Sequence, residues 1–154
     1  MGGRAPFRVR PARLADLDTL TAFNQAMAWE SERIRLRPRV LRAGVKAVLT
    51  DPSKGRYLVA HRGGQVCGQL MVTFEWSDWR NGDWWWIQSV YVAPAFRRQG
   101  VFEALYRTVR TQARKAGVRG LRLYVERHNV RAKATYLAVG MKKARYELFE
   151  LGEE

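Results

Sequence analysis

Two glycine-containing turns fix the arrangement of the middle of this 154-residue chain. Gly63-Gly64 separates strand-like runs at 57–61 and 65–76, and Asn81-Gly82 separates the second run from a third at 84–92. A Gly-Gly or Asn-Gly pair between runs rich in β-branched and aromatic residues is typical of a β-hairpin. The sequence therefore predicts a meander of three antiparallel strands.

Helical patterns stand on both sides of this meander. Apolar residues at helical spacing predict two helices before it, and the rest of the chain alternates helix and strand. The predicted order is strand 7–10, helix 12–29, helix 38–49, the meander, helix 101–116, strand 121–125, helix 129–140 and strand 144–151. We therefore expect an α/β (α+β) fold, with a mixed, mostly antiparallel central sheet flanked by helices, in a single domain 1–154.

The composition excludes several classes of protein. Cys67 is the only cysteine, so an internal disulfide and a thiolate metal cluster are both excluded, and with only His61 and His128 we expect no metal site. No apolar run approaches the roughly 18 residues that span a bilayer, and no secretory signal is visible at the N-terminus. We expect a cytoplasmic protein with no membrane partner.

The formal net charge of +14 has three candidate explanations. A polyanionic ligand, either a nucleotide cofactor or a nucleic acid, is one. An arginine-favouring composition without functional meaning is another, and a charged, solvated surface is the third. Because the arginines are spread along the whole chain, the charge alone does not choose among them.

The segment 89–102 runs from a strand through an arginine-rich turn into the start of a helix. A helix start offers N–H groups without intrahelical partners and a partial positive charge, which together attract phosphate. Gly100 permits close approach of a ligand, and Arg97 and Arg98 add positive charge. The alternative is an ordinary strand-to-helix turn with solvated arginines. Neither a Walker P-loop nor a Gly-x-Gly-x-x-Gly fingerprint occurs.

Two segments resemble the sequence blocks of the GNAT superfamily of N-acetyltransferases. Arg97-Arg98-Gln99-Gly100-Val101, after a strand, resembles that superfamily's acyl-CoA signature. The segment 125–141, with Asn129 and Tyr136, resembles its second block. Phe102 departs from the pattern, because the family usually has Gly or Ala there, and a glutamate that the family often uses as a water-mediated base is absent near Trp86.

The resemblance implies a GNAT-like fold and transfer of the acetyl group of acetyl-CoA, as co-substrate, to a primary amine by direct attack. It implies that Tyr136 donates a proton to the leaving thiolate; the alternative is a tyrosine that only packs on the sheet. The acceptor is a small-molecule or peptide amine, and a homodimer is compatible with the family. The implied cofactor-binding residues are Val90, Tyr91, Val92, Arg97, Arg98, Gln99, Gly100, Val101, Phe102, Asn129 and Tyr136.

Acidic and aromatic residues in the first half are candidates for binding the acceptor. Glu30 and Glu32 end the first predicted helix, where the family builds its acceptor pocket, although a solvated helix end explains them equally well. Trp86 is the candidate pocket wall among tryptophans that otherwise suit a core. The general base stays unassigned. A basic nucleic-acid-binding module, which we consider unlikely, and a catalytically inactive acyl-CoA-binding domain remain the alternatives.

Overall fold

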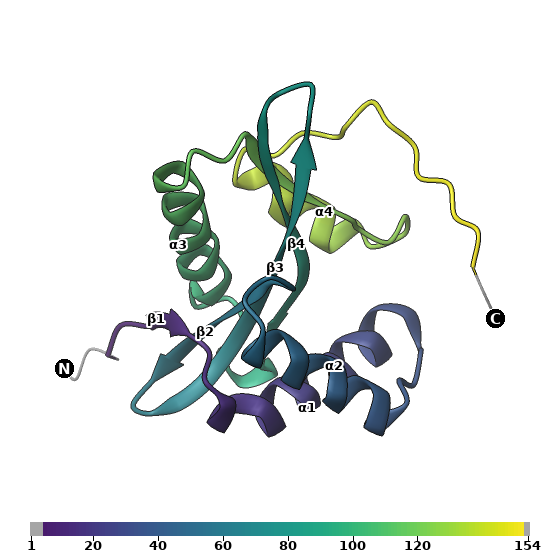
Figure 1. Cartoon of the computed structure of the whole chain (residues 1–154). Helices are drawn as coiled ribbons and strands as arrows, with labels where there is room; N and C mark the ends of the chain where they lie inside the picture. The colour runs from purple at the N-terminus through teal and green to yellow at the C-terminus, as the bar shows by residue number, and fades with distance from the viewer. Residues whose placement is uncertain (1–4, 153–154) are drawn as a thin grey trace. The chain divides into compact units, whose positions relative to one another are not determined.

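A five-stranded sheet in the order β1-β2-β3-β4-β5 is the framework of residues 5–124 (Figure 1). The computed structural model describes residues 5–152. All neighbouring strands are antiparallel except β4 and β5, which are parallel. The strands are β1 (Arg8–Pro11), β2 (Arg56–Arg62), β3 (Gln65–Ser77), β4 (Gly82–Val92) and β5 (Gly120–Leu123). The predicted meander and the mixed, mostly antiparallel sheet are confirmed.

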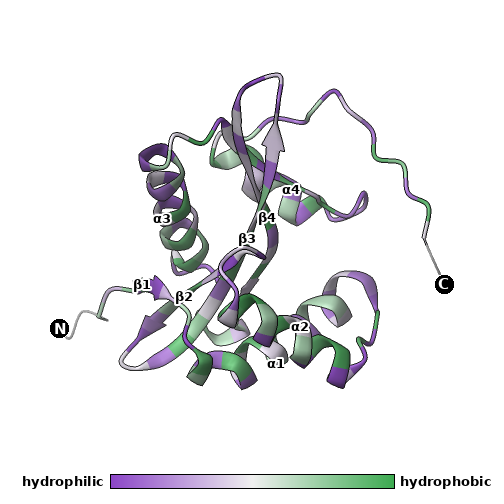
Figure 2. Ribbon diagram, viewed as in Figure 1, coloured by the Kyte–Doolittle hydropathy of each residue, from purple (hydrophilic) through white to green (hydrophobic). Residues whose placement is uncertain are grey.

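Helices cover both faces of this sheet. The helical segments of this unit are η1 (Leu14–Asp16), α1 (Leu17–Glu32), α2 (Pro38–Thr50), η2 (Pro94–Phe96) and α3 (Val101–Lys115). Leu58 is buried in the core beneath α3, whereas its neighbours in β2, Tyr57 and Val59, are buried in the core beneath α1 and α2. The period of two along a strand thus places one core on each face of the sheet. Figure 2 shows the hydrophilic residues of α3 on its outer side.

A β-bulge in β4 changes which residues of the strand face α3. Ile87 pairs with Val72 and Ser89 pairs with Met71, so Gln88 is the additional residue. Ile87 and Val90 consequently both pack into the core beneath α3, although strict alternation would send them to opposite faces. The bulge turns Tyr91 toward α1, while Val90 and Val92 on either side of it face α3. The ring of Tyr91 lies 5.1 Å from that of Phe23 in α1.

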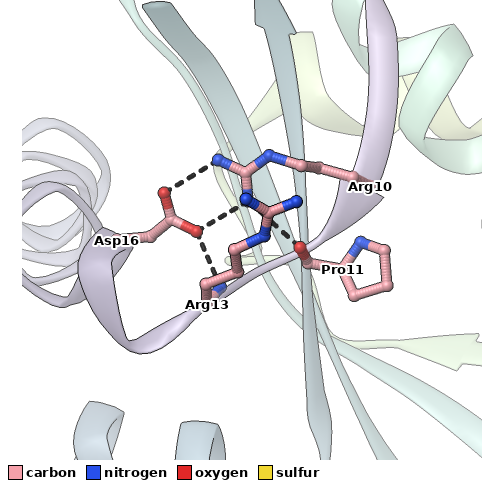
Figure 3. A network of polar contacts seen from close by, with 4 residues as sticks. All are labelled: Arg10, Pro11, Arg13 and Asp16. Carbon is pink, nitrogen blue, oxygen red and sulfur yellow. Dashed lines mark hydrogen bonds and ion pairs between the residues drawn. The ribbon is translucent and has the colours of Figure 1, made fainter. Parts of the chain in front are cut away.

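A charged pair holds the end of β1 against η1 (Figure 3). The Arg10 guanidinium donates to both carboxylate oxygens of Asp16, at 2.8 and 3.0 Å, and the Arg13 backbone N–H donates to the same carboxylate at 2.7 Å. The Asp16 side chain is only 9% exposed. The hydrogen bond from Arg10, outweighing the opposing effect of burial, lowers the pKa of Asp16.

Replacing Asp16 with asparagine is expected to lower the free energy of unfolding at neutral pH by about 2 kcal/mol, because a charge-assisted, largely buried interaction is lost. Since the pKa of Asp16 is lower in the folded chain, its contribution is complete above the ordinary Asp pKa of about 3.9 and is lost as the pH falls through the folded value. Urea unfolding at neutral and acidic pH measures both effects. Asp18→Asn, at an exposed ion pair with Arg42, is the control and should change stability by less than about 0.5 kcal/mol. Equal losses of stability in the two variants would show that the buried contact between Arg10 and Asp16 contributes no more than an exposed ion pair.

Residues 125–152 form a second compact unit, which contains α4 (Val130–Ala138). Asn129 is the N-cap of α4, as predicted, and its side-chain oxygen accepts a hydrogen bond from the Ala132 N–H at 3.1 Å. The predicted strand 144–151 is wrong, because these residues form no strand. Alternating apolar residues give a segment one apolar face, but a strand also requires a partner for its backbone groups. Tyr146, Leu148, Phe149 and Leu151 are instead 61–90% exposed.

No helix in the described part of the chain is long and apolar enough to span a bilayer.

Candidate active site

The turn between β4 and α3 contains two residues in the left-handed region. Arg98 has a φ of 60° and Gly100 a φ of 86°. Such residues between others of ordinary conformation turn successive backbone N–H groups toward one side, and the concavity that results binds anions. For arginine this conformation is unfavourable, so the surrounding structure must enforce it. The turn thus has a backbone geometry suited to an anion, and the anion seat itself stays a prediction.

The start of α3 lies directly after this turn. Its N-cap is Gly100, which has no side chain to accept from the first N–H groups, and the Ala104 N–H is bonded to the Gly100 carbonyl at 3.1 Å. A methyl group built on Gly100 would meet no atom within 4 Å, so space around this residue is open. The positive end of the helix macrodipole therefore faces an open surface.

Neighbouring contacts hold the turn in this conformation. The Gln99 amide oxygen accepts from the Arg62 guanidinium at 3.1 Å, and its nitrogen donates to the Ala95 carbonyl at 2.9 Å. Val101, at 2% exposure, anchors the other side in the core beneath α3. The ring of Phe102 lies 5.8 Å from that of Tyr106, one turn further along α3. A side chain larger than Gly or Ala is thus accommodated at position 102 by packing along the helix.

Arg97 and Glu30, predicted for different roles, contact each other. The Arg97 guanidinium donates to one oxygen of Glu30 at 2.7 Å, and the Tyr91 hydroxyl donates to the other at 3.0 Å. Arg97 also donates to the Val92 carbonyl at 2.9 Å. Burial, and then the Glu30 carboxylate, raise the pKa of Tyr91. The last turn of α1 is therefore fastened to the end of β4 and to the turn that follows it. Glu32 is exposed.

The edge of β4 that faces β5 is paired over only part of its length. The parallel register runs from Trp84 opposite Gly120 to Ile87 opposite Leu123, where β5 ends. Residues 88–92 continue β4 and pair with β3 alone among the described strands. This segment includes Val90, Tyr91 and Val92, which the family resemblance implies to be cofactor-binding residues. A strand edge without a pairing strand presents N–H and C=O groups to which an extended ligand can hydrogen bond.

Trp86, the predicted pocket wall, belongs to a cluster that the sequence did not reveal. Its indole N–H donates to Glu75 at 3.2 Å, and Arg122 donates to the same carboxylate oxygen at 2.7 Å. The Trp86 ring stacks on Tyr124 with ring centroids 4.4 Å apart. Trp85 faces the opposite way into the core at 4% exposure, as strand alternation predicts. A carboxylate contributed by β3 thus lies beside the strand position where the family glutamate is missing.

A second group of polar side chains is buried beneath α1. The Asn24 amide donates to the Tyr57 hydroxyl at 3.3 Å, and the Ser89 hydroxyl donates to the Gln69 side chain at 3.4 Å. Burial raises the pKa of Tyr57. Gln69 is fully buried, and its amide nitrogen has no partner among the described residues. Gln69 and Ser89 interrupt apolar strands, and this was the signal in the sequence that could have identified them.

Two predicted site residues, Asn129 and Tyr136, lie in the second unit. The Asn129 side chain caps α4, and burial raises the pKa of Tyr136. The hydroxyl of Tyr136 therefore keeps its proton at neutral pH. Across the described part of the chain, no three His, Cys, Asp or Glu side chains are grouped as metal ligands.

Residues 16–141 match the model of the acetyltransferase (GNAT) family, so the chain belongs to this family. A solved structure of a possible acetyltransferase from Clostridium difficile 630 is 43% identical and superimposes with a TM-score of 0.91, over 97% of this chain and 99% of that one. The protein is thus an acyltransferase that transfers acetyl groups.

More distant structures share the fold alone. The aminoglycoside N-acetyltransferase AAC(6')-Iy, solved in complex with CoA, is 15% identical, with a TM-score of 0.79 over 98% of this chain and 97% of that one. A ribosomal-protein-alanine N-acetyltransferase from Brucella melitensis biovar Abortus 2308 is 14% identical, with a TM-score of 0.77 over 96% of this chain and 100% of that one. No curated protein is similar enough in sequence to count as a match.

Proposed function

We propose that this protein is an N-acetyltransferase that uses acetyl-CoA as co-substrate and seats the pyrophosphate of CoA on residues 97–102. The observation that carries the proposal is the turn with Arg98 and Gly100 in the left-handed region, directly before the open start of α3. Both features favour an anion, and they occur in the segment that resembles the acyl-CoA signature.

The described residues fit such a ligand. The open space at Gly100 admits a phosphate group, and the exposed Arg98 adds a positive charge. The unpaired edge at residues 88–92 offers hydrogen-bonding groups to the amide-containing arm of CoA. The related fold of AAC(6')-Iy, a protein solved with CoA, is consistent with this assignment.

The chemistry follows from these groups. Acetyl-CoA supplies the acetyl group as a thioester. The backbone at residues 88–92 orients the arm, and an N–H from this edge stabilises negative charge on the carbonyl oxygen during attack by the amine. Tyr136 donates its proton to the sulfur of the leaving thiolate. A simple thiol has a pKa of about 8.5, so a tyrosine needs close positioning for this transfer.

Glu30 is the residue that we assign to the cationic acceptor amine. Its two oxygens accept bonds from Tyr91 and Arg97, and a carboxylate with about four acceptor sites can receive further donors. Trp86, stacked on Tyr124, is assigned to a wall of the acceptor pocket. After the ammonium group has lost one proton to solvent, the neutral primary amine attacks the thioester directly, without an acyl-enzyme intermediate. The C–N bond forms as the C–S bond breaks, and the second proton lost by the amine returns to the oxygen of Tyr136.

Replacing Glu30 with glutamine is expected to raise the KM for the acceptor about tenfold and to leave kcat nearly unchanged, because uniform binding is lost. The glutamine oxygen still accepts one hydrogen bond, so the local fold is retained. Steady-state kinetics with the acceptor varied provides the measurement, and Glu32→Gln, at an exposed position, is the control. A normal KM for Glu30→Gln would refute the assignment.

Thermal unfolding with acetyl-CoA or with a generic oligonucleotide tests the proposed function. A ligand at 100 times its Kd stabilises the folded state by about 2.7 kcal/mol. We expect a clear rise in Tm with acetyl-CoA and no comparable rise with the oligonucleotide. Stabilisation by the oligonucleotide alone would overturn the proposal.

A further inference from the structure

The segment that joins α1 to α2, together with the first two residues of α2, carries a dense group of arginines. Arg33, Arg35, Arg37 and Arg39 alternate with other residues, and all four side chains are exposed; we call residues 33–39 the arginine loop. Within the described part of the chain, none of the four forms an ion pair with a carboxylate. Glu30, three residues before Arg33 in the sequence, forms its ion pair with Arg97.

The arginine loop is held in place by hydrogen bonds. The Gln25 side chain in α1 donates to the Leu36 carbonyl at 2.7 Å and accepts from the Leu36 N–H at 3.2 Å. The Ile34 N–H donates to the Ala28 carbonyl at 3.2 Å, which closes the end of α1. These bonds fix the backbone from which the arginines project, so less freedom is lost when they bind a partner.

Trp29 orders two of the guanidinium groups. Those of Arg33 and Arg35 lie 5.2 and 5.1 Å from the centre of its ring, within the range of a cation–π interaction. A guanidinium stacked on an aromatic ring still presents its N–H edge, which matches the geometry of a carboxylate. The two groups are thus positioned as donors, and neither has a side-chain hydrogen bond to another described residue.

Helix stability does not explain the arginines at the start of α2. Arg37 is the N-cap of this helix and Arg39 lies in its first turn, which contains no acidic residue. Positive charge is unfavourable at this end of a helix, because the macrodipole is positive there. The local structure would be more stable with acidic or neutral residues, which indicates that the charge serves an interaction.

We propose that the arginine loop binds anionic groups of the acceptor, so that the favoured substrate is a peptide amine followed by acidic residues. This inference rests on the proposed function. The location supports it, because Glu30 lies one turn before Arg33 and contacts Arg97 and Tyr91 beside the anion seat. The same charge disfavours polycationic acceptors such as polyamines.

A carboxylate-bearing peptide fits this surface better than a nucleic acid does. Recognition of single-stranded nucleic acid uses aromatic rings on which bases stack. Trp29, the aromatic residue of this surface, is already in contact with two guanidinium groups of its own chain. The N–H groups of the arginine loop are held in a fixed arrangement, and their geometry suits carboxylates.

Matched peptide acceptors test this inference. Peptides with the same free N-terminal amine are followed either by Asp and Glu or by Asn and Gln, and release of CoA thiol gives kcat/KM for each. The test variant is Arg33→Gln, Arg35→Gln, Arg37→Gln and Arg39→Gln together. The control removes the same charge from the exposed side of α3, through Arg107→Gln, Arg110→Gln, Arg114→Gln and Lys115→Gln together.

The wild-type protein is expected to prefer the acidic peptide at least tenfold at low salt. The test variant should lose most of this preference, and the α3 variant should keep it. Equal kcat/KM for both peptides in the wild-type protein, or no activity with either, would overturn the inference. Equal losses of the preference in both variants, or reduced acetyl-CoA affinity in the test variant, would do so as well. Oligonucleotide binding that depends on the arginine loop, without a preference among peptides, would also overturn the inference. Thermal shifts with acetyl-CoA in the same samples distinguish failure of this inference from failure of the proposed function. Absence of any shift in the wild-type protein refutes the proposed function itself.

Discussion

Replacing Tyr136 with phenylalanine is expected to lower kcat about 100-fold and to change the affinity for acetyl-CoA less than twofold. The substitution removes only the hydroxyl that donates a proton to the leaving thiolate, and general acid catalysis contributes rate factors of about this size. Because burial raises the pKa of Tyr136, the acid form persists at neutral pH. Deprotonation of Tyr136 should accordingly lower wild-type turnover as the pH rises through a value above the ordinary pKa of tyrosine, about 10.

Thiol-release kinetics and calorimetric titration of acetyl-CoA measure the two effects. Tyr106→Phe, at a partly buried position of α3 next to Phe102, is a matched control that removes a tyrosine hydroxyl elsewhere. Unchanged turnover in the Tyr136 variant would remove this residue as the acid. A loss of acetyl-CoA affinity as large as the loss of kcat would instead indicate a binding role.

Replacing Gly100 with aspartate is expected to weaken acetyl-CoA binding about 100-fold. The added carboxylate would lie at the anion seat, where repulsion between like charges at a few ångströms amounts to about 2–4 kcal/mol near a protein surface. The open space around Gly100 means that the side chain itself displaces no protein atom. The fold should therefore survive, and circular dichroism verifies this.

Gly100→Asn separates charge from shape. Asparagine has nearly the same size as aspartate, and both tolerate a positive φ better than most residues do. We expect the asparagine variant to lose about tenfold in affinity, much less than the aspartate variant. Equal losses would show that the space at Gly100 matters and the charge does not, and retention of full affinity by both would place the pyrophosphate elsewhere.

The sequence was sufficient for the elements that carry their own local signals. The turns at Gly63-Gly64 and Asn81-Gly82 predicted the meander, and the cap residue Asn129 marked the start of α4. The strand predicted at 144–151 failed, because alternation identifies an apolar face but not a pairing partner. The bulge at Gln88 was also invisible, since it depends on the register between β3 and β4.

The parts of the candidate site that are formed by residues adjacent in sequence were predictable. The contacts between residues far apart in sequence were not. The proposed anion seat lies within one continuous turn, so Arg98 and Gly100 could be chosen from the sequence. The contact of Arg97 with Glu30 joins residues 67 positions apart, and that of Arg122 with Glu75 joins residues 47 apart. Such pairs follow from the packing of α1 and the pairing of three strands, which local patterns do not specify.

The pyrophosphate seat is tested most directly by the backbone amide signals of the turn in nuclear magnetic resonance spectra. Acetyl-CoA is titrated into labelled protein, with acetyl-pantetheine, which lacks the pyrophosphate, as the comparison. Amide protons of Arg98, Gly100 and Val101 should shift strongly to higher frequency with acetyl-CoA, because they then donate to phosphate oxygens, and should shift little with acetyl-pantetheine. Saturating binding of acetyl-CoA that leaves these amide signals unmoved would contradict the account.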